Sequence, residues 1–216
     1  MGANDIRRAA TVVATRETNG GPEVLVVERS ASSRFLPGYV AFPGGAVDDD
    51  DAQLAERWFG EAGEAARAAA VRELIEETNI AVTASGARLV EAADPLGCVH
   101  ADPAAASTLH EIARWVAPED VPVRFDARYF AVAVDADVDP VADGGETAAA
   151  WWVSPRTLLD EWEAGERRLY WPTWLTVIEL AACDSVAAVL ALRIDPREPT
   201  DDEAASMPPS VFWQDR

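Results

Sequence analysis

Residues 72–77 read Arg-Glu-Leu-Ile-Glu-Glu, a hexapeptide with carboxylates at Glu73, Glu76 and Glu77. On a helix, spacings of three and four residues bring all three carboxylates onto one face. Like charges at these spacings destabilise an isolated helix by about 0.2–0.5 kcal/mol, so helix formation alone does not favour the pattern. A group of hard oxygen ligands is what a divalent cation such as Mg2+ binds. The hexapeptide therefore indicates either a metal site or a solvated acidic helix face.

A glycine pair lies upstream of this helix, in the stretch Phe42-Pro43-Gly44-Gly45. Glycine permits the backbone to approach a ligand closely. Glu64 lies eight residues before Arg72. Together these residues resemble the Nudix box, a glycine followed by E-x7-R-E-U-x-E-E-x-G-U in which U is aliphatic; the second half of the box is residues 72–80. The resemblance implies a Nudix hydrolase.

The chain departs from the family pattern in two places. The pattern has five residues between its glycine and its first glutamate, whereas eighteen residues, 46–63, separate that glycine from Glu64. This insertion begins with the acidic run Asp48 to Asp51 and could displace Glu64, because in one regular helix Glu64 and Glu73 would lie about 180° apart. The other departure is Asn79 in place of the glycine after the helix, where asparagine also tolerates the left-handed conformation.

The composition excludes several classes of function. The net charge of −20 argues against a nucleic-acid partner, because binding a phosphate backbone needs a basic surface. A small phosphorylated substrate is still compatible with this charge, because a bound metal ion inverts the local charge. All 18 basic residues are arginine, which excludes covalent chemistry on lysine.

The chain carries no sign of a membrane or secretory protein. It contains no run of 18 apolar residues, and residues 1–5 lack the basic and apolar regions of a secretory signal. We therefore expect a cytoplasmic protein with no membrane partner and with Cys98 and Cys183 reduced. The oligomeric state stays open, with a homodimer as one option.

Hydrophobic periodicity and turn signals predict alternating strands and helices. Strands are expected at 9–16, 24–28, 39–42, 80–83, 128–134 and 148–153, and helices at 52–59, 64–78, 107–116, 154–163, 173–182 and 185–192. Residues 92–106 are expected to be irregular. These elements predict an α/β protein in which a mixed sheet carries helices on both faces, in agreement with the Nudix α/β/α sandwich that the resemblance implies.

The expected organisation is one domain with additions. A Nudix domain would cover residues 8–165, and a C-terminal helical extension, 166–194, would pack on the same domain. Residues 195–216 form an acidic, proline-rich tail that we expect to be loosely ordered or to wrap the surface.

The resemblance also implies a chemistry and a role for each box residue. Family members hydrolyse the pyrophosphate of a nucleoside diphosphate linked to another moiety, with Mg2+ or Mn2+ as cofactor. Arg72 would orient carboxylates by ion pairing, the alternative being an ordinary surface pair. The general base would be Glu73 or Glu146, which follows the turn Asp143-Gly144-Gly145. The expected catalytic residues are Glu73, Glu76, Arg72 and Glu146, and the expected metal ligands are the Gly45 carbonyl, Glu73, Glu76, Glu77 and Glu64.

A second motif points to a substrate. Arg29-Ser30, followed by Arg34-x3-Gly38-x3-Phe42 and the glycine pair, resembles the motif L-L-T-x-R-S-x3-R-x3-G-x3-F-P-G-G of coenzyme A diphosphatases. Arginines at these positions could bind phosphate bidentately or pair with local acids. Residues 124–130 resemble the downstream part of the larger members of that branch, which also carry an insertion in the box. We expect a small phosphorylated substrate, coenzyme A or acyl-coenzyme A, bound by Arg29, Arg34, Phe42 and Arg128.

Other interpretations stay open. The substrate could be ADP-ribose, a dinucleotide or a nucleotide sugar. A non-catalytic nucleotide sensor with the Nudix fold is a rival of another class. Trp171 and Trp174 could stack on an adenine ring, although tryptophan more often anchors a core.

Overall fold

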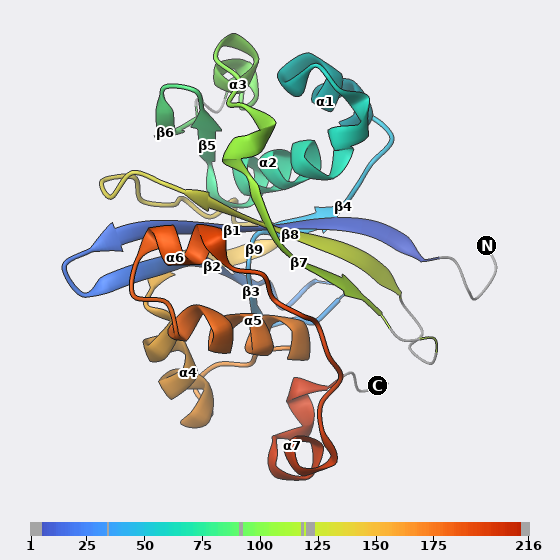
Figure 1. Cartoon of the computed structure of the whole chain (residues 1–216), viewed down its shortest axis with the longest axis vertical. Helices are drawn as coiled ribbons and strands as arrows, with labels where there is room; N and C mark the ends of the chain where they lie inside the picture. The colour runs from blue at the N-terminus through green and yellow to red at the C-terminus, as the bar shows by residue number, and fades with distance from the viewer. Residues whose placement is uncertain (1–5, 34, 91–92, 118, 120–123, 213–216) are drawn as a thin grey trace.

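The central feature of the fold is a seven-stranded mixed sheet covered on both faces (Figure 1). The computed structural model describes residues 6–33, 35–90, 93–117, 119 and 124–212. One face is covered by helices α1 (Asp51–Phe59), α2 (Ala65–Thr78) and α3 (Gly97–Ala101) and by the hairpin of β5 (Ile80–Thr83) and β6 (Gly86–Leu89). The other face is covered by α4 (Pro155–Glu163), α5 (Trp171–Ala181) and α6 (Val186–Ala191). The predicted sandwich with C-terminal helices is confirmed.

The N-terminal hairpin forms the middle of the sheet. Strands β1 (Arg7–Thr18) and β2 (Gly21–Arg29) are joined by a tight turn that contains Gly20 and Gly21, and Gly21 adopts a positive φ of 103°. β1 also runs parallel to β8 (Phe125–Ala133) along most of its length. β9 (Thr147–Val153) runs antiparallel to β2. The sheet is therefore mixed, as the sequence predicts.

The two strands of this hairpin diverge away from their turn. From Thr15↔Val24 to the turn they pair with each other. Farther along, β3 (Val40–Ala41) pairs with β2, and β4 (Gly44–Ala46) pairs with β1. Residues 40–46 therefore fill the space between the diverging strands and carry the glycine pair into the centre of the molecule.

The prediction of a helix over residues 107–116 is wrong. A short 3-10 turn, Ala106–Thr108, leads into strand β7 (His110–Val116), which pairs antiparallel with β8. Backbone pairing with a strand distant in sequence and the burial of Ile112 outweigh the local helix signals. Within 92–106, expected to be irregular, the chain forms the short helix α3.

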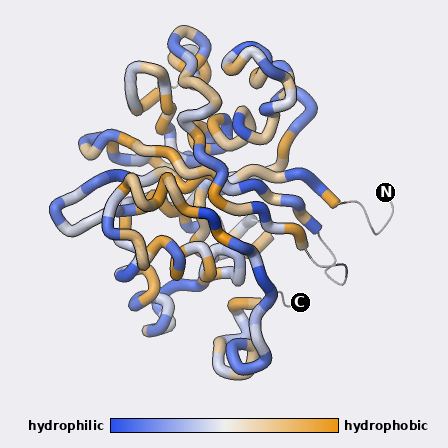
Figure 2. Tube along the Cα trace, in the orientation of Figure 1, coloured by the Kyte–Doolittle hydropathy of each residue, from blue (hydrophilic) through white to orange (hydrophobic). Residues whose placement is uncertain are grey.

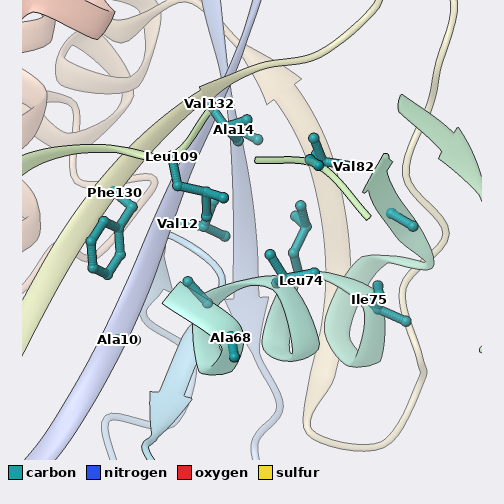
Figure 3. Packing of buried hydrophobic residues seen from close by; sticks show 14 of the residues in the cluster. Ala10, Val12, Ala14, Ala68, Leu74, Ile75, Val82, Leu109, Phe130 and Val132 are labelled. Atoms are coloured by element: carbon teal, nitrogen blue, oxygen red, sulfur yellow. The ribbon is translucent and has the colours of Figure 1, made fainter. Parts of the chain in front are cut away.

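Helix α2 presents the hexapeptide from a well-packed base. Its inner face buries Ala68, Leu74 and Ile75 in the same hydrophobic cluster as Val12 of β1 (Figure 3). The helix ends at Asn79 in the left-handed conformation, with φ 57°, which confirms the expectation for this residue.

The opposite layer is built from capped helices and aromatic side chains. Ser154 accepts a hydrogen bond from the Thr157 N–H at 3.1 Å, and Ser185 caps α6 in the same way. The rings of Trp171 and Trp174 stack with centroids 5.2 Å apart and are 7% and 6% exposed. Their burial supports a role in the core rather than in stacking on a substrate.

Residues 195–212 run along the surface beyond α6 and contain α7 (Asp201–Ser206). The described part of the predicted tail thus wraps the surface. Figure 2 shows hydrophilic residues in α7 and hydrophobic residues both in the strands of the sheet and in the helices packed on it. Cys98 and Cys183 are free thiols. Across the described ranges, every helix is too short or too polar to span a membrane.

Candidate active site

The glycine pair and the hexapeptide lie against each other. The Gly44 N–H donates a hydrogen bond to Glu77 Oε2 at 3.1 Å. A Cβ atom on residue 45 would overlap the carboxylate of Glu73, so Gly45 allows that carboxylate to lie directly on the backbone. Strand β4 therefore brings main-chain atoms to two of the three carboxylates.

The guanidinium of Arg72 is the centre of the site. Its Nη1 donates to Glu73 Oε1 at 2.7 Å and to Glu76 Oε2 at 3.0 Å, and its Nη2 donates to the Ala46 carbonyl at 3.0 Å. Its Nε and Nη2 donate to the two carboxylate oxygens of Asp51 at 2.9 and 3.0 Å. Burial opposes the charge of Arg72, but the hydrogen bond with Asp51 and the charge of Glu73 raise its pKa above the ordinary value. These contacts support the orienting role predicted for Arg72.

Asp51 is a site residue that the sequence analysis missed. It lies in the first turn of α1 with 0% exposure, and its Oδ2 also accepts a hydrogen bond from the Asp48 N–H at 2.8 Å. Five residues separate Gly45 from Asp51, which is the spacing of the first glutamate in the family pattern. That spacing was the available signal, and aspartate in place of glutamate concealed it. Counted this way, the extra residues lie between Asp51 and Arg72, where they form α1 and the turn after it.

Glu64 lies apart from the Arg72 cluster. It directly precedes α2 and forms an ion pair with Arg67, whose Nε donates to the Leu109 carbonyl at 3.1 Å. Within the described part of the chain, the acidic partners of Arg72 are Asp48, Asp51, Glu73 and Glu76, and Glu64 is not among them. The structure therefore places this predicted ligand away from the other carboxylates, as its angular position on the helix suggested.

The carboxyl group of Glu77 is strongly perturbed. Glu77 is only 6% exposed. Burial, followed by the charge of Glu73, raises its pKa to about 8, while the Gly44 N–H and Arg29 act in the opposite direction. Burial also raises the pKa of Glu73, against the effect of Arg72. The buried carboxylate of Glu77, acted on by the charge of the partly buried Glu73, favours either a retained proton or a bound cation.

The loop before β9 borders the same site. Asp143 accepts hydrogen bonds from three backbone N–H groups of residues 145–147, at 2.9–3.2 Å, and its charge acts on Glu77. Glu146 is exposed, and its carbonyl accepts a hydrogen bond from the Ser30 N–H at 2.8 Å. The predicted base Glu146 therefore lies on a loop that is ordered by Asp143 and attached to the end of β2.

Arg29, one of the predicted phosphate ligands, lies beside this loop. In the pairing of β2 with β9 it is opposite Thr147, the first residue of β9. Its Nε donates to the Phe35 carbonyl at 2.8 Å, and its Nη2 lies 3.4 Å from Ser33 Oγ. The charge of Arg29 also lowers the pKa of Glu77. Its hydrogen-bond partners in the described chain are a carbonyl and a hydroxyl rather than an acid, so its charge is available to a phosphate group.

The other predicted substrate residues have different surroundings. Phe42 is 4% exposed and packs edge-on against Tyr129, with ring centroids 6.5 Å apart. It supports the glycine loop from the core. Arg128 donates from two nitrogens to Glu111 at 3.1 and 2.5 Å, so its charge is already compensated. Arg34 lies outside the described residues.

The oxygen donors of this site suit a divalent cation. Glu73, Glu76, Glu77 and the Gly45 carbonyl are hard ligands, which Mg2+ and Mn2+ prefer. As the side chains stand, no three Asp, Glu, His or Cys residues of the described ranges are arranged to hold a metal ion. Glu73 and Glu76 bind Arg72 instead. These residues fit the cation if the two carboxylates exchange the guanidinium for the ion.

Known proteins resemble this chain over most of its length. Residues 5–171 match the family model described as NUDIX domain. The crystal structure of a NUDIX hydrolase from Alicyclobacillus acidocaldarius is similar over 90% of this chain and 100% of that chain, with 32% sequence identity and a TM-score of 0.77. Nudix hydrolase 7 of Caenorhabditis elegans is 29% identical over 178 residues, or 76% of this chain. The chain spans 56% of the length of that relative.

Removing the charge of Asp51 is expected to destabilise the protein. Asp51→Asn takes away the two-oxygen partner of the Arg72 guanidinium, at a cost of about 3 kcal/mol in the free energy of unfolding. Asp49→Asn makes the same change at an exposed neighbour and should cost less than about 0.5 kcal/mol. Urea unfolding followed by tryptophan fluorescence measures both variants. Equal effects would show that the contact between Asp51 and Arg72 adds no stability.

Glu77 is expected to make the metal-free protein less stable as the pH rises. Its folded pKa of about 8 lies above the ordinary value of 4.5, so between these values the unfolded chain releases a proton that the folded chain keeps. Its stabilising contribution is present below the ordinary pKa and is lost as the pH rises through the folded pKa. Glu77→Gln should remove this slope and be more stable than the unchanged chain at high pH by about 2–4 kcal/mol. Urea unfolding in EDTA at several pH values measures the slope, and an unaltered slope in the variant would contradict the assignment.

Proposed function

Because the chain belongs to the Nudix hydrolase family, we propose that it hydrolyses the pyrophosphate bond of a nucleoside diphosphate linked to another moiety. The observation that carries this proposal is the approach of Glu73 and Glu77 to the backbone of Gly44 and Gly45, beside the Arg72 guanidinium. This arrangement gathers hard oxygen ligands, a buried acid of raised pKa and an orienting cation at one place, which are the requirements of metal-assisted phosphoryl chemistry.

A divalent cation would be held by oxygens of four residues, namely Glu73, Glu76, Glu77 and Gly45. When bound, Mg2+ or Mn2+ neutralises phosphate oxygens and acidifies or positions the attacking water. The chain itself contributes orientation. Arg72 holds two of the carboxylates, and Asp51 holds Arg72 from α1. Arg72 therefore keeps these two carboxylates close together beside the glycine loop, from where they would turn to a bound cation.

We place Glu146 as the general base that takes a proton from the attacking water, with Glu73 as the alternative. Glu146 is exposed, and the Asp143 turn orders its loop beside Glu77. The Glu73 carboxylate already binds the Arg72 guanidinium at 2.7 Å. The exposed carboxylate of Glu146 can contact the attacking water without first breaking an ion pair.

The favoured substrate is coenzyme A or acyl-coenzyme A. The support comes from the resemblance of residues 29–45 to the coenzyme A diphosphatase motif and from the partners of Arg29, which are neutral oxygens. A guanidinium in that state binds a phosphate group bidentately without first breaking an ion pair. ADP-ribose, dinucleotides and nucleotide sugars carry the same pyrophosphate and are the alternatives within this reaction class.

A non-catalytic nucleotide sensor is the alternative of another class. The observation in its favour is that Glu73 and Glu76 turn to Arg72 instead of sharing a metal position. Against it stands the complete set of carboxylates in the second half of the box, which a binding module has no chemical need to keep.

A product assay distinguishes these functions. Coenzyme A, ADP-ribose, NADH and diadenosine polyphosphates are incubated with the protein and either Mg2+ or Mn2+, and the products are separated by chromatography. We expect 3′,5′-ADP from coenzyme A, and a loss of turnover of about a hundredfold or more in Glu77→Gln, because a metal ligand is removed. Circular dichroism checks that this variant keeps its fold.

Two outcomes would contradict the proposal at different levels. Hydrolysis of another compound with coenzyme A left intact would replace the substrate but keep the reaction. Nucleotide binding without hydrolysis of any of the four compounds would favour the sensor.

A further inference from the structure

We propose that the C-terminal segment, residues 194–212, positions Arg29 for substrate binding, with Tyr39 as the positioning residue that links them. This inference rests on the proposed function only for its effect on substrate affinity. The ordering of the end of β2 by the contacts of this segment does not depend on the proposed function. The segment lies beyond residues 5–171, which match the Nudix domain, so the role is specific to this extension.

The segment starts at one edge of the sheet and is attached along its path. The Ile194 N–H donates to the Ile112 carbonyl of β7 at 2.7 Å. Farther on, the Arg197 carbonyl accepts a hydrogen bond from Trp171 Nε1 at 2.8 Å, at the start of α5. Figure 1 shows the segment running from α6 past α5 to α7. It therefore follows the layer formed by the C-terminal helices.

The segment is ordered by its own contacts. Arg197 binds Glu203 through two hydrogen bonds of 2.7 Å, and its guanidinium lies over the Trp171 ring at 5.4 Å. Thr200 and Glu203 form a capping box at the start of α7. A segment with this many internal contacts loses little conformational entropy when it binds another part of the chain.

The last described residues of the segment are attached to the core. Val211 is 0% exposed, and the Phe212 ring lies 5.9 Å from the ring of Trp171. A polar tail that only covered the surface would not need to bury an aliphatic side chain completely. The burial of Val211 holds the neighbouring Ser210 carbonyl in place.

Tyr39 connects this anchor to Arg29. The Tyr39 hydroxyl donates to the Ser210 carbonyl at 2.7 Å. The Tyr39 carbonyl in turn accepts a hydrogen bond from the Arg29 N–H at 2.9 Å, and the Gly38 N–H donates to the Arg29 carbonyl at 3.0 Å. Tyr39 and Gly38 thus bind the two polar groups of the Arg29 backbone, and the segment fixes Tyr39 through its hydroxyl.

This chain of contacts predicts an effect on substrate affinity rather than on the chemical step. Arg29 would bind phosphate, whereas the carboxylates on α2 are oriented independently by Arg72. A loosened Arg29 must be ordered again on each binding event, which weakens ground-state binding. Turnover at saturating substrate depends on the α2 carboxylates and on Glu146, whose loop is ordered separately by Asp143, and it should change little.

The test uses the full-length chain and three variants. Tyr39→Phe removes the hydroxyl that donates to Ser210, and deletion of residues 207–216 removes the acceptor. Tyr170→Phe is the matched control, because Tyr170 is a partly buried neighbour whose hydroxyl makes no hydrogen bond within the described part of the chain. Hydrogen–deuterium exchange is measured on peptides that contain Arg29 and Gly38, and KM and kcat are measured on the compound that the product assay identifies.

We expect faster exchange at the Arg29 and Gly38 amides in Tyr39→Phe and in the deletion, but not in Tyr170→Phe. KM should rise about three- to tenfold in Tyr39→Phe, as loss of one partly buried hydrogen bond implies, with kcat unchanged. Adding Tyr39→Phe to the deletion should have no further effect, because both changes break the same link.

Unaltered exchange in both Tyr39→Phe and the deletion would overturn the proposal, whether or not the protein hydrolyses any compound. Faster exchange with an unaltered KM, or an equal loss of kcat, would overturn the positioning role. If the chain proves to be a nucleotide sensor, the same comparison is made with the Kd of the bound nucleotide, and the proposed hydrolysis then fails independently of this inference.

Discussion

A single guanidinium compensates the acidic centre of this protein. Arg72 binds Glu73 and Glu76 on its own helix, Asp51 on α1 and the Ala46 carbonyl on β4. In a chain of net charge −20, these carboxylates would repel one another strongly without it. Three elements meet at this one side chain. The packing of α1 on α2 and the orientation of the site carboxylates therefore depend on the same contacts.

The divergence of β1 and β2 allows the glycine pair to reach the site. If the two strands paired along their whole length, residues 40–46 would have no sheet positions to occupy. Because they separate beyond Thr15↔Val24, the backbone of Gly44 and Gly45 passes between them and reaches α2. The arginine proposed to bind substrate at the end of β2 and the glycine loop proposed to bind a metal in β4 both depend on this divergence of the two strands.

Sequence signals were reliable where the decisive contacts are local. The predicted helix starts at Ser154 and Ser185 and the left-handed Asn79 depend on residues within one helical turn, and all three are confirmed. The same kind of signal failed at residues 107–116, where a helix-like start precedes a strand. There the outcome depends on pairing with β8, which the local pattern does not contain.

In the candidate site, too, the sequence predicts the local arrangement but not the contacts between distant residues. The helical spacing of the hexapeptide was sufficient to predict that Glu73, Glu76 and Glu77 share a face, because that periodicity is a local property of the chain. Only the folded protein shows that Asp51, rather than Glu64, accompanies Arg72, because α1 must first fold back against α2. Burial and ion pairing join residues that are distant in the chain, and their energies depend on three-dimensional neighbours that linear spacing does not specify.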